Sequence, residues 1–200
     1  MNVLQSARKS LPLTVAATTL LALFAAVEPA MSREAEAVRP TVAASADKAA
    51  RGKYLVTVAG CNDCHTPWKM GAAGPEPDMS RMLSGHPEQM ELPPAPRPHG
   101  PWVVAAAATN TAWSGPWGMS FTANLTPDAD TGLGKWTLRN FTDTIRTGRH
   151  LGRGRPILPP MPIPMYKHFT DEDLESIFVY LRAIPAVKNR VPEPLPPAGE

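Results

Sequence analysis

The chain of 200 residues is long enough for one compact domain with an attached leader, but short for two domains with separate cores. Charged residues make up 19% of the sequence and the formal net charge is +2, so neither sign dominates and nucleic-acid binding is not favoured. The 24 prolines exceed twice the average usage of about 5%, and aromatic residues reach only 6%, so we expect much irregular chain around a small core that needs an additional staple.

Residues 1–37 have the pattern of a secretory leader. Two basic residues precede an almost wholly apolar stretch over residues 11–27, and residues 35–37 form a small-x-small cleavage site. The apolar stretch, at about 15 to 17 residues, lies at the lower limit for crossing a bilayer, so an uncleaved membrane anchor is the alternative. We therefore expect an exported, periplasmic protein in which residues 38–45 link the leader to the domain.

The next segment carries a helix and a cysteine motif. Apolar residues at helical spacing predict a helix over residues 45–59, and Gly60 ends it. The only two cysteines occur as Cys61-Asn62-Asp63-Cys64-His65, which is the spacing for attachment of a c-type haem. One turn of helix brings both thiols to the two vinyl groups on one haem edge, and the adjacent imidazole then faces the iron. The motif predicts one covalently bound haem c, with His65 as an axial iron ligand.

Two other interpretations of the motif are weaker. A Cys-x-x-Cys pair in an exported protein could be a thiol oxidoreductase site, but that site normally opens a helix after a strand, and no βαβ pattern surrounds it here. A structural zinc site needs four ligands, so it would have to recruit distant histidines such as His86, His99 or His150.

From Thr66 to about Thr122 the chain is rich in proline, glycine and methionine, which predicts an ordered irregular loop over the haem. A short strand over residues 103–108 is its one regular element. Thr137 then has the features of an N-cap for a helix that runs to Thr147 and stops at Gly148. The buried face of this helix is predicted to contain Leu138, Phe141 and Ile145.

A last helix comes after a second loop. Thr170 begins it in the manner of a capping box, with Asp173 in place of the usual glutamate. The tail over residues 185–200 is proline-rich, so we expect it to lie extended on the surface. The apolar stripe of the last helix is predicted to comprise Leu174, Ile177, Phe178 and Leu181.

A haem iron in an electron carrier usually takes a second axial ligand, and methionine in this position raises the reduction potential. Met161 lies between Pro160 and Pro162, whose rings restrict the backbone and leave little conformational freedom to lose on folding. Met165 has a similar proline setting four residues later, and Met119 lies in a less rigid loop. The remaining candidates are His150 and His168, which would give a bis-histidine site of lower potential.

Over residues 46–184 these features resemble the class I cytochrome c family. The resemblance implies a mainly α fold, with three or more helices around a covalent haem and long loops rich in proline and glycine. In this family the methionine ligand shortly precedes a capped last helix, which Met161 fits better than Met165. The resemblance also implies that the Pro75 carbonyl accepts a hydrogen bond from His65 Nδ1.

The same resemblance assigns a role to Trp136, whose indole N–H would donate to a haem propionate. It further implies that the first and last helices cross, so that Gly52 and Tyr54 meet Phe178 and Leu181.

Shorter stretches look like those in cytochrome subunits of bacterial periplasmic dehydrogenases. Such subunits often carry several haems, whereas this chain has one motif and a long insertion over residues 82–122. The stretches are residues 82–87, 124–128, 131–136 and 158–162.

The sequence therefore favours an electron-transfer protein that is not itself an enzyme, with His65 and Met161 on the iron. Its partners would be redox proteins such as a periplasmic dehydrogenase or a terminal electron acceptor, with membrane association only if the leader stays attached. One alternative is a five-coordinate haem protein that binds a small ligand or reduces peroxide. Another is a dehydrogenase subunit in which the haem is chiefly structural.

Overall fold

The computed structural model describes residues 44–96, 98 and 100–197. The predicted leader over residues 1–37 and most of the linker lie outside these residues. The chain divides after residue 44, and nearly all of the described residues belong to the unit that begins at Ser45. In the described part of the chain, every helix is too short or too polar to cross a bilayer.

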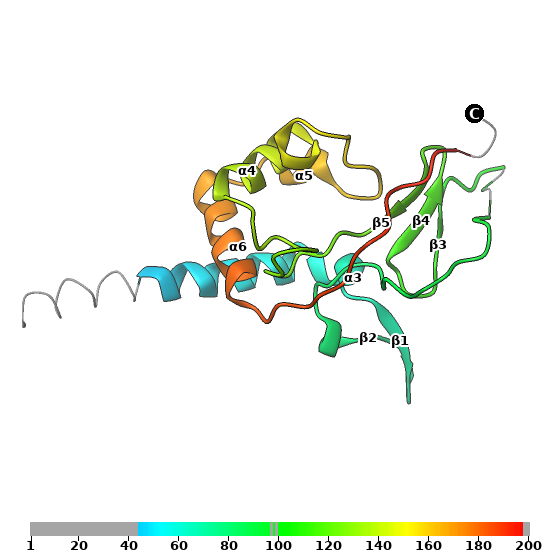
Figure 1. Ribbon diagram of the computed structural model, residues 1–200, viewed down its shortest axis with the longest axis horizontal. Helices are drawn as coiled ribbons and strands as arrows, with labels where there is room; N and C mark the ends of the chain where they lie inside the picture. Colours follow the sequence, from blue (N-terminus) through cyan, green and yellow to red (C-terminus); the bar gives the residue numbers. More distant parts are fainter. Residues whose placement is uncertain (1–43, 97, 99, 198–200) are drawn as a thin grey trace, which may run out of the picture. The chain divides into compact units, whose positions relative to one another are not determined.

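Two long helices cross near the start and the end of this unit (Figure 1). The first covers residues 44–58, and the second is α6 (Asp171–Ala183). They approach closely at Gly52, where a Cβ atom would lie 1.9 Å from the carbonyl oxygen of Ser176. Glycine is required here because any side chain would overlap the backbone of α6.

The residues at the crossing can be named in part. The atoms nearest to Gly52 belong to Ser176 and Tyr180. Tyr54 is 57% exposed, and the Arg51 guanidinium lies 5.5 Å from the centre of its ring. The buried face of this helix passes through Leu55 and Val56, and the contact of Tyr54 with Phe178 and Leu181 stays a prediction.

The predicted caps of the two later helices are confirmed. Thr137 and Asn140 form a capping box at the start of α4 (Leu138–Thr147), and Gly148 ends the helix with φ 66°. The Thr170 hydroxyl accepts a hydrogen bond from the Asp173 N–H at the start of α6. Leu138 is 36% exposed, which corrects its predicted burial.

The core lies between these helices. Phe141 of α4 packs on Phe178 of α6, with ring centres 5.5 Å apart. The other buried side chains come from both long helices, from α4 and from two loops. They are Leu55, Val56, Leu83, Leu133, Ile145, Leu174, Ile177, Leu181 and Ile184.

The stretch from Thr66 to Thr122 contains more regular structure than the sequence predicted. An antiparallel hairpin pairs β1 (Trp68–Gly71) with β2 (Gly74–Pro77). A three-stranded antiparallel sheet has the order β3-β4-β5, with β3 at Ala105–Ala106, β4 at Ala112–Gly115 and β5 at Gly118–Phe121. Glycines flank both tight turns, and these short strands lack the apolar alternation that would reveal them.

Besides α3 (Cys61–His65), the described residues form three further short helices. They are η1 (Met79–Arg81), η2 (His150–Gly152) and α5 (Ile163–Tyr166). In Figure 1, α4 and α5 lie on one side of the unit, and α3 (Cys61–His65) lies across from them.

The C-terminal segment does more than lie on the surface. It runs from the end of α6 to the β3–β5 sheet (Figure 1), where Leu195 and Met119 exchange two backbone hydrogen bonds of 2.9 Å. Asn189 is buried on the way, at 2% exposure. Residues 185–197 therefore hold together loops that are distant in sequence.

Candidate functional site

Helix α3 carries the cysteine motif, and a sharp bend separates it from the preceding helix. Gly60 adopts φ 69° and ψ 25°, a left-handed conformation that glycine accepts without strain. The chain therefore changes direction directly before Cys61, and the five motif residues form a separate helical turn. His65 is its last residue and is buried.

The His65 ring is fixed by one hydrogen bond. Nδ1 lies 2.8 Å from the carbonyl oxygen of Ala123, which can only accept, so Nδ1 carries the proton. Burial lowers the pKa of His65, against a smaller opposing effect of that carbonyl. A neutral imidazole with Nδ1 protonated has a free lone pair on Nε2, the state that a metal ligand needs.

The carbonyl partner of His65 corrects a sequence-based prediction. The resemblance implied that Pro75 accepts from Nδ1, but Pro75 lies exposed in β2 and pairs with Met70 across the β1–β2 hairpin. The Gly74-Pro75 pair serves a hairpin turn here. Ala123 supplies the acceptor instead, from a position 58 residues after His65.

Further contacts that the sequence did not predict hold the end of α3. The fully buried Thr66 hydroxyl donates to Asn62 Oδ1 at 2.9 Å and accepts from the Leu83 N–H at 2.9 Å. The Gly85 N–H donates to the His65 carbonyl at 2.8 Å. In the sequence, the threonine directly after the motif was the one feature that could have indicated these contacts.

The two cysteines are free thiols. Burial raises the pKa of Cys61 to about 11 and also raises the pKa of Cys64. A reactive thiol pair needs a lowered pKa, so this environment argues against the thiol oxidoreductase interpretation.

Two of the other predicted residues reach the same core. Met161 and Trp136 are partly buried and pack against the hydrophobic cluster that Cys61 also contacts. Met165 is 72% exposed, so the two methionines have different environments. The Tyr166 hydroxyl donates to the Ala59 carbonyl and so attaches the segment after Met161 to the chain before Gly60.

The histidines that the sequence left as alternatives have other surroundings. His86 is fully buried, with Nδ1 2.9 Å from the Thr111 hydroxyl. His150 and His168 are exposed, and His150 meets the Trp136 ring edge-on at 5.3 Å. His99 lies outside the described residues. Among the residues that the structure describes, no three His, Cys, Asp or Glu side chains gather where they could bind a metal ion.

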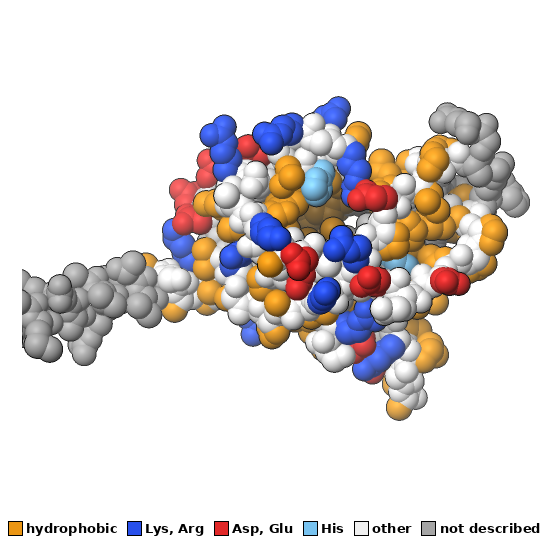
Figure 2. Space-filling model, in the orientation of Figure 1, with side chains coloured by type: hydrophobic (Ala, Val, Ile, Leu, Met, Phe, Trp, Pro, Cys, Tyr) orange, Lys and Arg blue, Asp and Glu red, His pale blue; other side chains and the backbone are white. Residues whose placement is uncertain are grey.

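One face of the described unit is hollowed (Figure 2). Figure 2 shows a hollow in this face, and comparison with Figure 1 places it between the α4–α5 side and α3. Hydrophobic atoms line the hollow, and basic and acidic side chains surround its mouth. A haem fits the chemistry here, because two free thiols, a neutral imidazole and a partly buried thioether come from elements around one apolar region.

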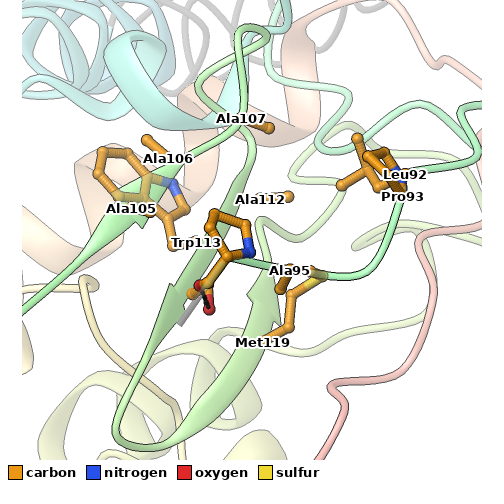
Figure 3. A pocket seen from close by; sticks show the side chains of 11 residues that line it. Leu92, Pro93, Ala95, Ala105, Ala106, Ala107, Ala112, Trp113 and Met119 are labelled. Atoms are coloured by element: carbon orange, nitrogen blue, oxygen red, sulfur yellow. Dashed lines mark hydrogen bonds between the residues drawn. The ribbon is translucent and has the colours of Figure 1, made fainter. Parts of the chain in front are cut away.

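A separate cavity of about 120 Å³ lies against the β3–β5 sheet (Figure 3). Its lining is apolar and includes Ala112, Trp113 and Met119. Ligand pockets usually have volumes of about 300–1,000 Å³, so this cavity is too small for a haem.

Comparison with known proteins gives relatives that are dehydrogenase subunits, several of them named as cytochrome subunits. The fructose dehydrogenase cytochrome subunit of Gluconobacter japonicus is 27% identical over 193 residues, which are 92% of this chain and 31% of that protein. The cytochrome c subunit of the quinone alcohol dehydrogenase of Gluconobacter oxydans is 29% identical over 39% of the chain and 17% of its own length. The gluconate 2-dehydrogenase cytochrome c subunit of Pantoea cypripedii is 34% identical over 32% of the chain and 14% of its own length.

The chain thus spans less than a third of these relatives. No protein-family model matches it.

Proposed function

We propose that this protein is an exported mono-haem c-type cytochrome that carries one electron at a time between redox partners. Cys61 and Cys64 would hold the haem, and His65 and Met161 would bind its iron. The observation that carries the proposal is the hydrogen bond from His65 Nδ1 to Ala123, which leaves Nε2 free beside two unpaired thiols. We also infer a class I cytochrome c-like arrangement over residues 46–184, supported by the crossing of the first and last helices at Gly52.

The protein would fix the position of the haem and set the chemical environment of its iron. When bound, the haem would supply an iron centre that alternates between the ferrous and ferric states. The Ala123 carbonyl sets the tautomer and the angle of the His65 ring, and it makes the imidazole more electron-rich. The lining of the hollow includes hydrophobic side chains (Figure 2), which a bound haem would contact with its flat face.

Burial supports Met161 over Met165 as the second ligand. A thioether is a weak ligand, so it must be held inside the apolar region by the surrounding chain. Met161 packs against the core that Cys61 contacts, whereas Met165 is 72% exposed. Trp136 packs against the same core, which supports its proposed role as the donor to a haem propionate.

The relatives support a dehydrogenase as a partner. Their names describe cytochrome subunits of fructose, alcohol and gluconate dehydrogenases. We propose that this chain accepts electrons from an exported dehydrogenase, either as its subunit or as a separate carrier. Its leader would place it in the periplasm.

Mass spectrometry of the denatured mature protein tests the proposal. We expect one added haem per chain in the wild type and none after Cys61 and Cys64 are changed to alanine. The visible spectrum should show a low-spin ferric form with a methionine–iron band, and the ferrous form should not bind carbon monoxide. An apoprotein that folds normally with free thiols would refute the proposal, and ferrous carbon monoxide binding would favour a five-coordinate haem enzyme.

A further inference from the structure

The strand β5 reaches the loop that carries Met161. The Ser120 hydroxyl lies 2.6 Å from the carbonyl oxygen of Pro159 and 3.4 Å from that of Trp113. A hydroxyl has one proton to donate, and the shorter contact is the stronger hydrogen bond. Ser120 is buried, at 7% exposure, so its proton is directed at Pro159 rather than shared with bulk water.

Few hydrogen bonds join the loop before Met161 to neighbouring segments. Pro159 and Pro160 lack the backbone N–H, so they cannot donate to neighbouring segments. Within the described part of the chain, the bond from Ser120 is the one side-chain hydrogen bond that residues 158–160 make. The next backbone hydrogen bond closes a tight turn, in which the Met161 carbonyl accepts from the Ile163 N–H at 2.9 Å.

The same stretch of chain also contacts the opposite ligand. Three residues after Ser120, the Ala123 carbonyl accepts a hydrogen bond from the N–H at His65 Nδ1. Antiparallel pairing with β4 on one side and the bridge from Met119 to Leu195 on the other hold β5 in place. Residues 120–123 therefore connect the cysteine motif with the loop before Met161.

We propose that Ser120 is a positioning residue for the axial methionine, and that the β3–β5 sheet of the long insertion serves to hold it. The inference rests on the proposed function, because it takes Met161 as the second ligand. Ser120 does not touch the iron. Its hydroxyl restrains Pro159, and so limits how far the Met161 thioether can move away from the metal.

Ser120→Ala in the purified holoprotein tests this role, with Ser114→Ala as the matched control. Ser114 is similarly buried in β4 of the same sheet, but its hydroxyl donates to Pro96 at 3.0 Å, away from the methionine loop. The readout is the affinity of the ferric protein for added imidazole, which must displace the thioether. We expect Ser120→Ala to bind imidazole about fivefold more tightly, the factor that one ordinary hydrogen bond produces, and to have a lower reduction potential.

Ser120→Thr keeps the hydroxyl and should restore the wild-type affinity. Equal imidazole affinity in wild type, Ser120→Ala and Ser114→Ala would overturn the inference. An equal increase in imidazole affinity in both alanine variants would also overturn it, because it would report a general loosening of the sheet. If the wild type already lacks a methionine–iron band, the proposed function fails instead, and the two failures are thereby distinguished.

Discussion

Replacement of Asn189 by alanine should destabilise the protein strongly, although this residue lies in the proline-rich C-terminal segment. Its side-chain amide donates to the carbonyls of Ser84 and His86, at 2.7 and 2.8 Å. Its side-chain oxygen accepts from Arg81 Nη2 at 3.2 Å and from the Glu88 N–H at 2.9 Å. One buried side chain thus bridges the tail to a loop about 100 residues earlier.

The magnitude can be worked out from these four bonds. Each ordinary hydrogen bond contributes about 1 kcal/mol net, and a buried group left without a partner costs about 1–3 kcal/mol. The backbone contacts of residue 189 to Thr131 and Asn124 would survive the substitution. We therefore expect a loss of about 3–4 kcal/mol, which is large for a single substitution outside an apolar core.

Urea unfolding of the holoprotein measures this loss, with Glu193→Gln as the control. Glu193 belongs to the same tail, but it pairs with Arg155 where its side chain is 82% exposed, so its removal should cost less than about 1 kcal/mol. A loss below about 1 kcal/mol for Asn189→Ala would show that the tail can leave these loops without consequence, and the reasoning would then be wrong.

Three further predictions concern the site and the pH dependence of stability. Met161→Ala should open the sixth iron position, lower the reduction potential and allow carbon monoxide binding, whereas Met165→Ala should keep the wild-type spectrum; reversed phenotypes would transfer the assignment to Met165. Trp136→Phe should lower the unfolding free energy of the holoprotein by about 1–3 kcal/mol, and an equal loss in the apoprotein would leave only a packing role. Burial lowers the pKa of His86 in the folded protein, so this imidazole binds a proton more readily in the unfolded chain. The folded protein therefore loses stability as the pH falls below about 6.5, the pKa of His86 in the unfolded chain. Unfolding measured against pH should show a shallower loss for His86→Gln, and an unchanged slope would contradict this.

The sequence predicted well those elements whose limits are set by residues close together in the chain. A capping threonine and a closing glycine mark α4, so its bounds are set by signals at its two ends. The predicted strand over residues 103–108 contains β3, but β4 and β5 were missed because they are short and partly built from alanine and glycine, residues that carry no strand signal. The pairing of the three strands depends on contacts that no local pattern encodes.

The same distinction applies to the site. Cys61, Cys64 and His65 are close neighbours in the chain, so their spacing alone is enough to predict haem attachment. The acceptor for His65 could not be found in this way, because Ala123 contributes only a backbone carbonyl and any residue type could do so. Pro75 was inferred by analogy, and the analogy failed because Gly74 and Pro75 form part of a hairpin.

The two proposed ligands differ in how the chain holds them, and this difference predicts how variants would behave. His65 is fixed by the Ala123 carbonyl and the Gly85 N–H, backbone groups that most substitutions leave in place. The segment around Met161 is attached instead through two side-chain hydroxyls, those of Ser120 and Tyr166. Each hydroxyl can be deleted by one substitution, and a thioether binds iron more weakly than an imidazole. Substitutions in this fold should therefore change the methionine side of the haem, and with it the reduction potential, well before they release the histidine.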